Sequence, residues 1–285
     1  MTAFKQSMGI PEGGEWDPFA GLDIDAATLR DFIGETAYSG AASRRHHAPK
    51  VDVPDLPVPQ AEKASTQQAF GQILNDLGRG DSDLAAHMVT TSPDVTVSTN
   101  LGGWVNQRGL FNRHERTDVF RQENVASVQR WTRTQSGQHF ELGIAENNLF
   151  LMLSALGLAE PLFGARILPV GTLYDPFVNR GLDALFYACY QDSRFMVVGT
   201  PSGVTLAPEG GAHQSVNTPL VGMSMPGLSY FEPAYADELA AIMTWGFHHM
   251  QAQDGGSVYL RLSTRNIAQP DRTLSSPDKD SITSG

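Results

Sequence analysis

Short apolar runs alternate with amphipathic stretches from residue 65 onward, and this pattern predicts strands separated by helices. The clearest helix is expected to begin at Pro233, because proline suits a first helical turn and the acidic pair Asp237–Glu238 complements the helix dipole. Its apolar residues recur at helical spacing, at Leu239, Ile242, Met243, Gly246, Phe247 and Met250. Another helix is expected to open with the capping sequence Ser65-Thr66-Gln67-Gln68 and to end at Gly78 or shortly before Gly80. Its predicted buried face consists of Phe70, Ile73, Leu74 and Leu77.

Further strands and helices follow from shorter apolar runs. Strands are predicted at residues 94–98, 165–170, 195–198, 228–231 and 257–262. A helix over 149–158 is apolar nearly all round and is therefore expected to be buried on several sides. A helix over 177–190 carries an apolar stripe of Leu182, Leu185, Phe186 and Cys189. The alternation predicts an α/β fold, a parallel sheet with helices on both faces, whose ligands bind beyond the carboxyl ends of the strands.

The two ends of the chain differ in amino-acid composition from the predicted domain at residues 65–265. Residues 1–64 are rich in proline, glycine and charge, so they predict an extended N-terminal arm with a short helical piece at 25–33. The basic residues at 44–47 indicate a solvated linker more than a phosphate site. Residues 266–285 are polar and indicate a linker toward a missing C-terminal domain.

Composition excludes several classes of protein. A chain of 285 residues with 41% hydrophobic and 18% charged residues is typical of a globular fold, and its net charge of −11 argues against a nucleic-acid or anionic-membrane surface. The single cysteine, Cys189, excludes an internal disulfide and suits a reducing compartment. Neither a membrane span nor a secretory signal is present, so we expect a soluble, cytoplasmic protein.

Glu146 is the leading candidate for chemistry. The segment from Gln138 to Asn148 is an extended run that ends in this carboxylate just where a helix begins. Backbone N–H groups at a helix start are unpaired and carry partial positive charge, so a buried glutamate there can be held facing a ligand and can exchange protons with a heterocycle. Taken alone, the position is more typical of an ordinary glutamate in a first helical turn, where acidic residues are enriched.

Three stretches in order resemble the central, pyrimidine-binding domain of the thiamine-diphosphate enzymes of the transketolase superfamily, and most closely the homodimeric E1 component of pyruvate dehydrogenase. The first is Gly143-Ile144-Ala145-Glu146-Asn147, and the second is Leu173-Tyr174-Asp175-Pro176-Phe177. The third runs from Gly199 through Glu209-Gly210-Gly211-Ala212-His213-Gln214 to Ser229-Tyr230-Phe231-Glu232-Pro233-Ala234-Tyr235-Ala236. The resemblance implies the thiamine-diphosphate-binding fold over roughly residues 65 to 265.

The resemblance also implies a role for each of five residues. Glu146 would hydrogen-bond N1′ of the cofactor's aminopyrimidine ring and promote the proton transfers that activate it. Phe177 would stack on that ring, Tyr174 would border it, and Ile144 would wedge beneath the cofactor. His213 would face the substrate, where an imidazole can donate to a developing oxyanion or move a proton.

One departure from the family limits what the chain is expected to do alone. The superfamily holds Mg²⁺ and the diphosphate with a Gly-Asp-Gly sequence and a later asparagine, and no Gly-Asp-Gly occurs here. We therefore expect no metal site on this chain, Mg²⁺ and diphosphate held by the diphosphate-binding domain of a partner subunit in a homodimer, and an inactive isolated chain. The sequence is expected to be an excised central region or, as the alternative, one subunit of a split enzyme.

Three functions stay open at this point. The first is the central domain of a thiamine-diphosphate-dependent pyruvate (2-oxoacid) dehydrogenase E1, passing an acyl group to a lipoamide-bearing E2 component. The second is the central region of a transketolase, which transfers ketol groups between sugar phosphates. The third is a non-catalytic module that keeps the fold, against which the combination of Glu146, Phe177 and His213 argues.

Overall fold

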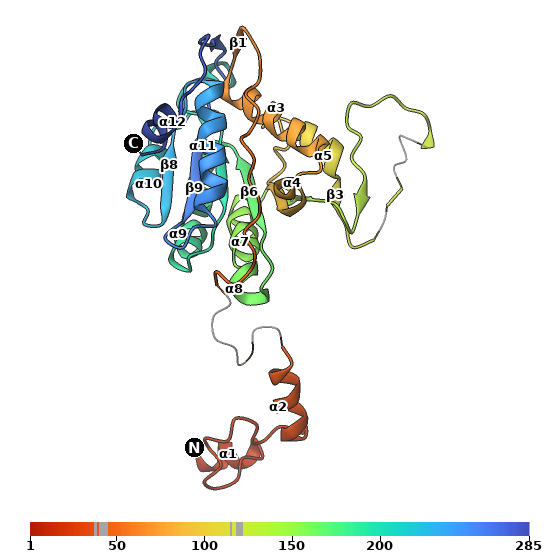
Figure 1. Ribbon diagram of the computed structural model, residues 1–285. Helices are drawn as coiled ribbons and strands as arrows, with labels where there is room; N and C mark the ends of the chain where they lie inside the picture. The colour runs from red at the N-terminus through yellow and green to blue at the C-terminus, as the bar shows by residue number, and fades with distance from the viewer. Residues whose placement is uncertain (37–38, 40–44, 115, 118–121, 285) are drawn as a thin grey trace.

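A parallel sheet of eight strands organises the chain (Figure 1). The computed structural model describes residues 1–36, 39, 45–114, 116–117 and 122–284. Strand order across the sheet is β4-β3-β5-β2-β6-β7-β9-β8, and each neighbouring pair is parallel. The strands are β2 (Met88–Ser92), β3 (Leu110–Phe111), β4 (Arg133–Thr134), β5 (His139–Glu141), β6 (Leu168–Leu173), β7 (Met196–Gly199), β8 (Leu228–Phe231) and β9 (Ser257–Arg261). The predicted α/β class is confirmed.

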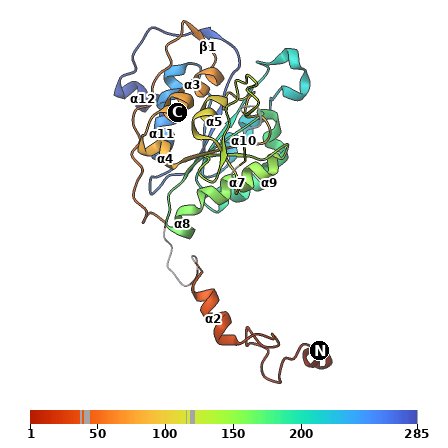
Figure 2. The same ribbon diagram turned by 90° about the vertical axis from the view of Figure 1, so that its right-hand side faces the viewer.

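Helices cover both faces of this sheet, and a separate hydrophobic core lies on each face (Figures 1 and 2). Side chains of β7 alternate between the two, since Met196 and Val198 join one core and Val197 joins the other. The first core is covered by α3 (Thr66–Arg79), α4 (Asp83–His87), α5 (Gly102–Arg108) and α11 (Ala236–His249). The second is covered by α7 (Glu146–Gly157), α9 (Leu182–Tyr190) and α10 (Thr218–Ser224). The smaller elements are α1 (Thr2–Ser7), α2 (Ala26–Gly34), α8 (Ala159–Phe163), α12 (Ser276–Ser284) and the 3-10 helices η1 (Asp175–Gly181), η2 (Ala207–Glu209) and η3 (Gly211–His213).

The two strongest sequence patterns give the two longest helices. In α3 the Ser65 hydroxyl caps the Gln68 N–H, the Gln68 side chain returns to the Ser65 N–H, and the predicted apolar face is buried. All six apolar residues predicted for α11 are buried as well. The start of α11 was predicted three residues too early, because Pro233 precedes the helix and Glu238 caps the backbone of Ala234 and Tyr235.

Three other predictions were wrong in position or burial. Residues 94–98 form turns and no strand, since Asp94 has φ 64° and the strand of this region ends at Ser92. The expected strand at 165–170 lies at 168–173. The outer side of α7 is not covered by the described residues, since Leu151 is 53% exposed while Leu149, Phe150 and Leu153 are fully buried.

The helix expected over 177–190 is divided into η1 and α9. The division falls at Gly181, which lies against α7: a Cβ at this position would overlap the Phe150 ring and lie 3.1 Å from the Glu146 carbonyl oxygen. Along α9 the buried residues are Ala184, Leu185 and Ala188. Of the predicted stripe, Leu185 is buried and Cys189 packs partly buried against the second core, whereas Leu182 and Phe186 are exposed. The close approach at Gly181 brings the end of η1 against the start of α7.

Both terminal segments have structure beyond the extended arm and polar linker predicted for them. Val51, Val53 and Leu56 are buried in the first core, and the Gln251 side chain bonds both the N–H and the C=O of Val51. Strand β1 (Lys63–Ala64) pairs antiparallel with β10 (Ile267–Ala268), and α12 packs on α11. The predicted short helix is confirmed as α2, which lies with α1 away from the sheet (Figure 1).

Candidate functional site

Glu146 is the first residue of α7, as predicted, and lies beyond the carboxyl end of β5. The residue is 7% exposed, which is little for a carboxylate. Its Oε1 accepts a hydrogen bond from Arg180 Nη1 at 2.8 Å. Arg180 comes from the end of η1, so the ion pair joins two segments 34 residues apart in sequence.

Three aromatic rings gather beside this ion pair. The centroid of the Phe177 ring lies 6.0 Å from that of Tyr174, and the His213 centroid lies 5.0 Å from Tyr174 and 6.3 Å from Phe177. The Arg180 guanidinium stacks over Phe177, with Cζ 3.7 Å from the ring centroid. Glu146, Tyr174, Phe177 and His213, which the sequence singled out from three separate stretches, therefore surround one place.

His213 reaches this cluster from the loop that follows β7. Its Nε2 lies 3.8 Å from a carboxylate oxygen of Glu209, and its Nδ1 is buried without a hydrogen-bond partner among the residues that the structure describes. A buried polar atom without a partner costs free energy. The Nδ1 atom therefore favours a polar ligand group next to the aromatic cluster.

Ile144 differs from the other predicted site residues. It lies two residues before Glu146, follows Gly143 at φ 67°, and is 78% exposed. Such a side chain is free to contact a ligand or another chain at this edge of the sheet, and it does not belong to either core.

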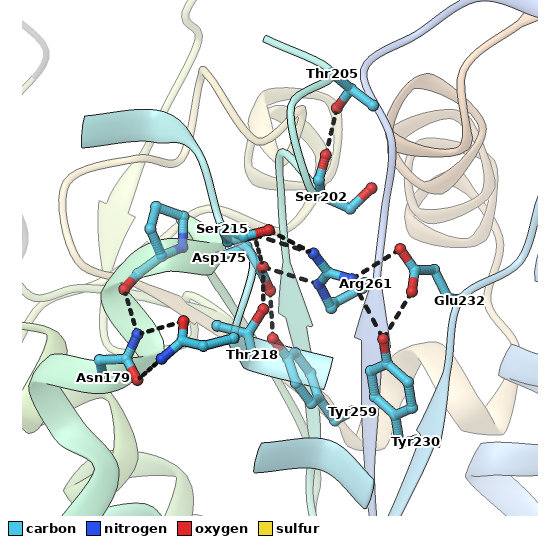
Figure 3. A network of polar contacts seen from close by, with 12 residues as sticks. Asp175, Asn179, Ser202, Thr205, Ser215, Thr218, Tyr230, Glu232, Tyr259 and Arg261 are labelled. Atoms are coloured by element: carbon cyan, nitrogen blue, oxygen red, sulfur yellow. Dashed lines mark hydrogen bonds and ion pairs between the residues drawn. The ribbon is translucent and has the colours of Figure 1, made fainter. Parts of the chain in front are cut away.

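A buried polar network that the sequence did not reveal fixes the segments that carry Phe177 and His213 (Figure 3). Asp175 is fully buried and accepts hydrogen bonds from the hydroxyls of Ser215, Thr218 and Tyr259. Arg261 Nε donates to Asp175 Oδ2 at 2.9 Å, and Arg261 Nη1 also pairs with Glu232 Oε1 at 2.8 Å. Asp175 thus ties the start of η1 to strand β9 and to the loop residue Ser215, which lies two residues after His213.

Burial sets the protonation of this network. Loss of water, together with the neighbouring Asp175 charge, raises the pKa of Tyr259 well above its ordinary value, so the phenol remains a donor. Burial alone would lower the pKa of Arg261, but the charge of Asp175 and hydrogen bonds to Tyr230 and Asp175 raise it. In the sequence, Asp175 stands two residues after the buried strand β6, and this is the local feature that could have pointed to the network.

The site is suited to a flat, nitrogen-rich ligand. It offers an aromatic face, a buried carboxylate that accepts hydrogen bonds, and an imidazole nitrogen without a partner. Among the described residues, no group of three or more histidine, cysteine, aspartate or glutamate side chains could hold a metal ion. No helix in the described part of the chain is long and apolar enough to cross a membrane.

The family model and the curated relatives that match this chain name the same enzyme component. The family described as the pyruvate dehydrogenase E1 component middle domain matches residues 58–270. The pyruvate dehydrogenase E1 component of Cupriavidus necator is 27% identical over 80% of this chain and 26% of its own length. That of Pseudomonas aeruginosa is 26% identical over 95% of this chain and 32% of its own length. The chain thus spans about a third or less of these curated relatives.

Solved structures show the same fold. A transketolase from Leishmania mexicana superimposes with a TM-score of 0.56 at 18% identity, over 95% of this chain and 33% of the transketolase chain. A Pichia stipitis transketolase mutant gives a TM-score of 0.60 at 18% identity, over 78% of this chain and 30% of that one. The identity is low enough that these structures establish the fold alone.

Proposed function

The chain belongs to the pyruvate dehydrogenase E1 middle-domain family, and from this membership and the site we propose that it binds the aminopyrimidine ring of thiamine diphosphate in an enzyme that decarboxylates a 2-oxoacid. Thiamine diphosphate, when bound, supplies the carbanion chemistry of such reactions. The chain would contribute the half of the site that holds the ring.

Each clustered residue has a distinct task in this proposal. Glu146 hydrogen-bonds N1′ of the ring and exchanges a proton with it, and its place at a helix start orients the carboxylate. Phe177 stacks on the ring, and Tyr174 and Ile144 border it. His213 faces the substrate as a proton donor, and its buried Nδ1 has no hydrogen-bond partner among the described residues.

One observation carries the proposal: a flat group bearing N–H donors already fits between Glu146 and Phe177. The guanidinium of Arg180 stacks on Phe177 at 3.7 Å and donates to Glu146 at 2.8 Å. An aminopyrimidine protonated at N1′ has the same planarity and the same kind of donor. The buried carboxylate and the aromatic face therefore fit the ring of the cofactor.

The rest of the cofactor is assigned to other parts of the complete enzyme. We propose that Mg²⁺ and the diphosphate are held by a diphosphate-binding domain of the partner subunit in a homodimer. A lipoamide-bearing E2 component would accept the acyl group, in the cytoplasm. Isolated from that domain, the chain is proposed to be inactive.

A transketolase activity is the second candidate. A relative named 6-deoxy-6-sulfo-D-fructose transketolase subunit SqwH, from a Clostridium strain, is 26% identical over 52% of this chain and 43% of its own length. Ring binding by Glu146 and Phe177 would serve both reactions. Assays of the complete enzyme with pyruvate and with a ketose donor would separate the two, since only a transketolase transfers a ketol group.

The experiment that tests ring activation replaces Glu146 by glutamine in the complete enzyme, with the diphosphate-binding domain present. Glu146→Gln keeps the shape and a hydrogen bond but removes proton exchange, so turnover and hydrogen–deuterium exchange at C2 of the cofactor should fall together by roughly 10²–10⁴-fold. Glu160→Gln is the matched control, because Glu160 is 8% exposed and pairs with Arg166 at 2.7 Å away from the aromatic cluster. Rates within a few-fold of wild type for Glu146→Gln would refute the assignment.

A further inference from the structure

Arg180 occupies the place that the proposed function assigns to the aminopyrimidine ring. Its Nη1 donates to Glu146 Oε1 at 2.8 Å, and its Cζ lies 3.7 Å from the centroid of the Phe177 ring. These are the two contacts proposed for the cofactor ring. A second planar group could not stack on the same face of Phe177 and bond the same carboxylate oxygen in the same place, so the guanidinium and the ring would compete for these two contacts.

We propose that Arg180 is a placeholder: its guanidinium fills the ring site in the free chain and is displaced when the ring binds. This inference rests on the proposed function and adds to it a competing group supplied by the chain itself. The Arg180 side chain therefore fills the ring site before the cofactor binds.

The electrostatics of Glu146 explain why a placeholder is useful. The Glu146 side chain is 8% exposed, and a buried carboxylate without a partner is costly. Arg180 supplies the missing positive charge, and a ring protonated at N1′ would supply it in turn. Glu146 therefore keeps a cationic N–H donor in both states.

The chemistry of arginine suits it to this exchange. Guanidinium is flat, delocalised and weakly hydrated, so it can stack on an aromatic face while donating to a carboxylate, which the ammonium of lysine cannot do. The Arg180 side chain is 52% exposed, so it can move into water without unpacking a core. Its backbone is held by η1 and by the contact of Gly181 with α7.

Competition predicts opposite effects of Arg180 on stability and on ring affinity. When the guanidinium occupies the site in most molecules, only the remaining fraction can bind the ring. The apparent dissociation constant for the ring is then the intrinsic constant divided by that open fraction. Removing Arg180 should therefore tighten ring binding by about tenfold while lowering thermal stability. A residue with a purely structural role would lower stability and would not improve binding.

The test titrates the full chain with thiamine, which carries the ring without the diphosphate, and follows binding by NMR. Arg180→Ala is expected to bind thiamine about tenfold more tightly than wild type and to unfold at a lower temperature. Arg272→Ala is the matched control, because Arg272 also stacks near an aromatic ring, at 5.3 Å from Tyr235, and pairs with Asp237 at 2.6 Å. It should lose stability with unchanged thiamine affinity. Unchanged or weaker thiamine binding by Arg180→Ala would overturn the placeholder.

A direct view of displacement comes from the arginine Nε–H signals of the wild-type chain. Thiamine should shift the Arg180 signal toward that of a solvated side chain and leave the Arg272 signal in place. An Arg180 signal that stays constant at saturating thiamine would also overturn the proposal.

Substitutions of the ring site distinguish failure of the placeholder from failure of the proposed function. If Glu146→Gln and Phe177→Ala weaken thiamine binding but Arg180→Ala does not strengthen it, the ring site stands and the placeholder is wrong. If neither Glu146→Gln nor Phe177→Ala changes thiamine binding in the Arg180→Ala background, the ring does not bind here. Both proposals are then wrong.

Discussion

Asp175 shows how a single buried residue can fix two parts of a site. Its carboxylate has no exposed surface. It accepts hydrogen bonds from the hydroxyls of Ser215, Thr218 and Tyr259 and from the guanidinium of Arg261 (Figure 3). Both carboxylate oxygens accept hydrogen bonds, Oδ2 from Ser215, Thr218 and Arg261 and Oδ1 from Tyr259, and a buried charge is tolerated when it is paired and hydrogen-bonded in this way. The segment that carries Phe177 and the loop that carries His213 are held in register by this one group.

We predict that Asp175→Asn lowers the free energy of unfolding by about 3 kcal/mol, because the variant leaves the buried Arg261 with one charged partner, the partly exposed Glu232. Urea denaturation measures the change. Asp183→Asn, an exposed carboxylate at the start of α9, is the control and should change the value by less than about 0.5 kcal/mol. A loss that small for Asp175→Asn as well would mean that the network adds little to stability.

Among the helices and strands, the sequence predicted best those helices whose own residues include capping or charged end residues and an apolar face. Helix α3 has a capping box and an apolar face, and α11 has an acidic first turn and an apolar face, so both could be predicted from local residues. The boundary of η1 depends instead on a contact with a helix distant in sequence. Its separation from α9 depends on the approach of α7 at Gly181, which no local pattern records.

The candidate site divides in the same way between local and distant information. Glu146, Tyr174, Phe177 and His213 stand in recognisable stretches, and the structure places them together. Arg180 and Asp175 could not be assigned from the sequence, because their partners lie 34 and up to 86 residues away. Contacts of that range depend on the order of strands in the sheet.

We predict that Gly181→Ala weakens the contact between η1 and α7, since its Cβ would overlap the Phe150 ring. Phe150 is fully buried and has little room to move, so overpacking should cost about 2 kcal/mol of unfolding free energy, seen by urea denaturation. Gly211→Ala is the matched control, because a Cβ there meets nothing within 4 Å. Equal stability of the two variants would show that η1 can retreat from α7 without cost.

The whole molecule presents a broad apolar surface on the helices that cover the second core. Leu151 of α7, Phe186, Tyr187 and Tyr190 of α9, and Leu220 and Met223 of α10 are all at least 48% exposed. An open groove between α9 and α10 is part of this surface, and its apolar lining consists of Leu182, Phe186, Leu220, Val221 and Met225. Contiguous apolar surface of this kind usually marks an interface. The homodimer that we propose would cover it.

We therefore predict that the chain self-associates through this surface and that sedimentation velocity detects a dimer at micromolar concentration. The paired change Leu151→Glu and Phe186→Glu should shift the population to monomer, because two charges would have to be buried without partners. Phe32→Glu is the control: Phe32 is 68% exposed on α2, away from the sheet, and its loss should leave the dimer intact. A wild-type chain that stays monomeric at high concentration would show that the interface needs the diphosphate-binding domain. A dimer that survives the paired change would place the interface on another face.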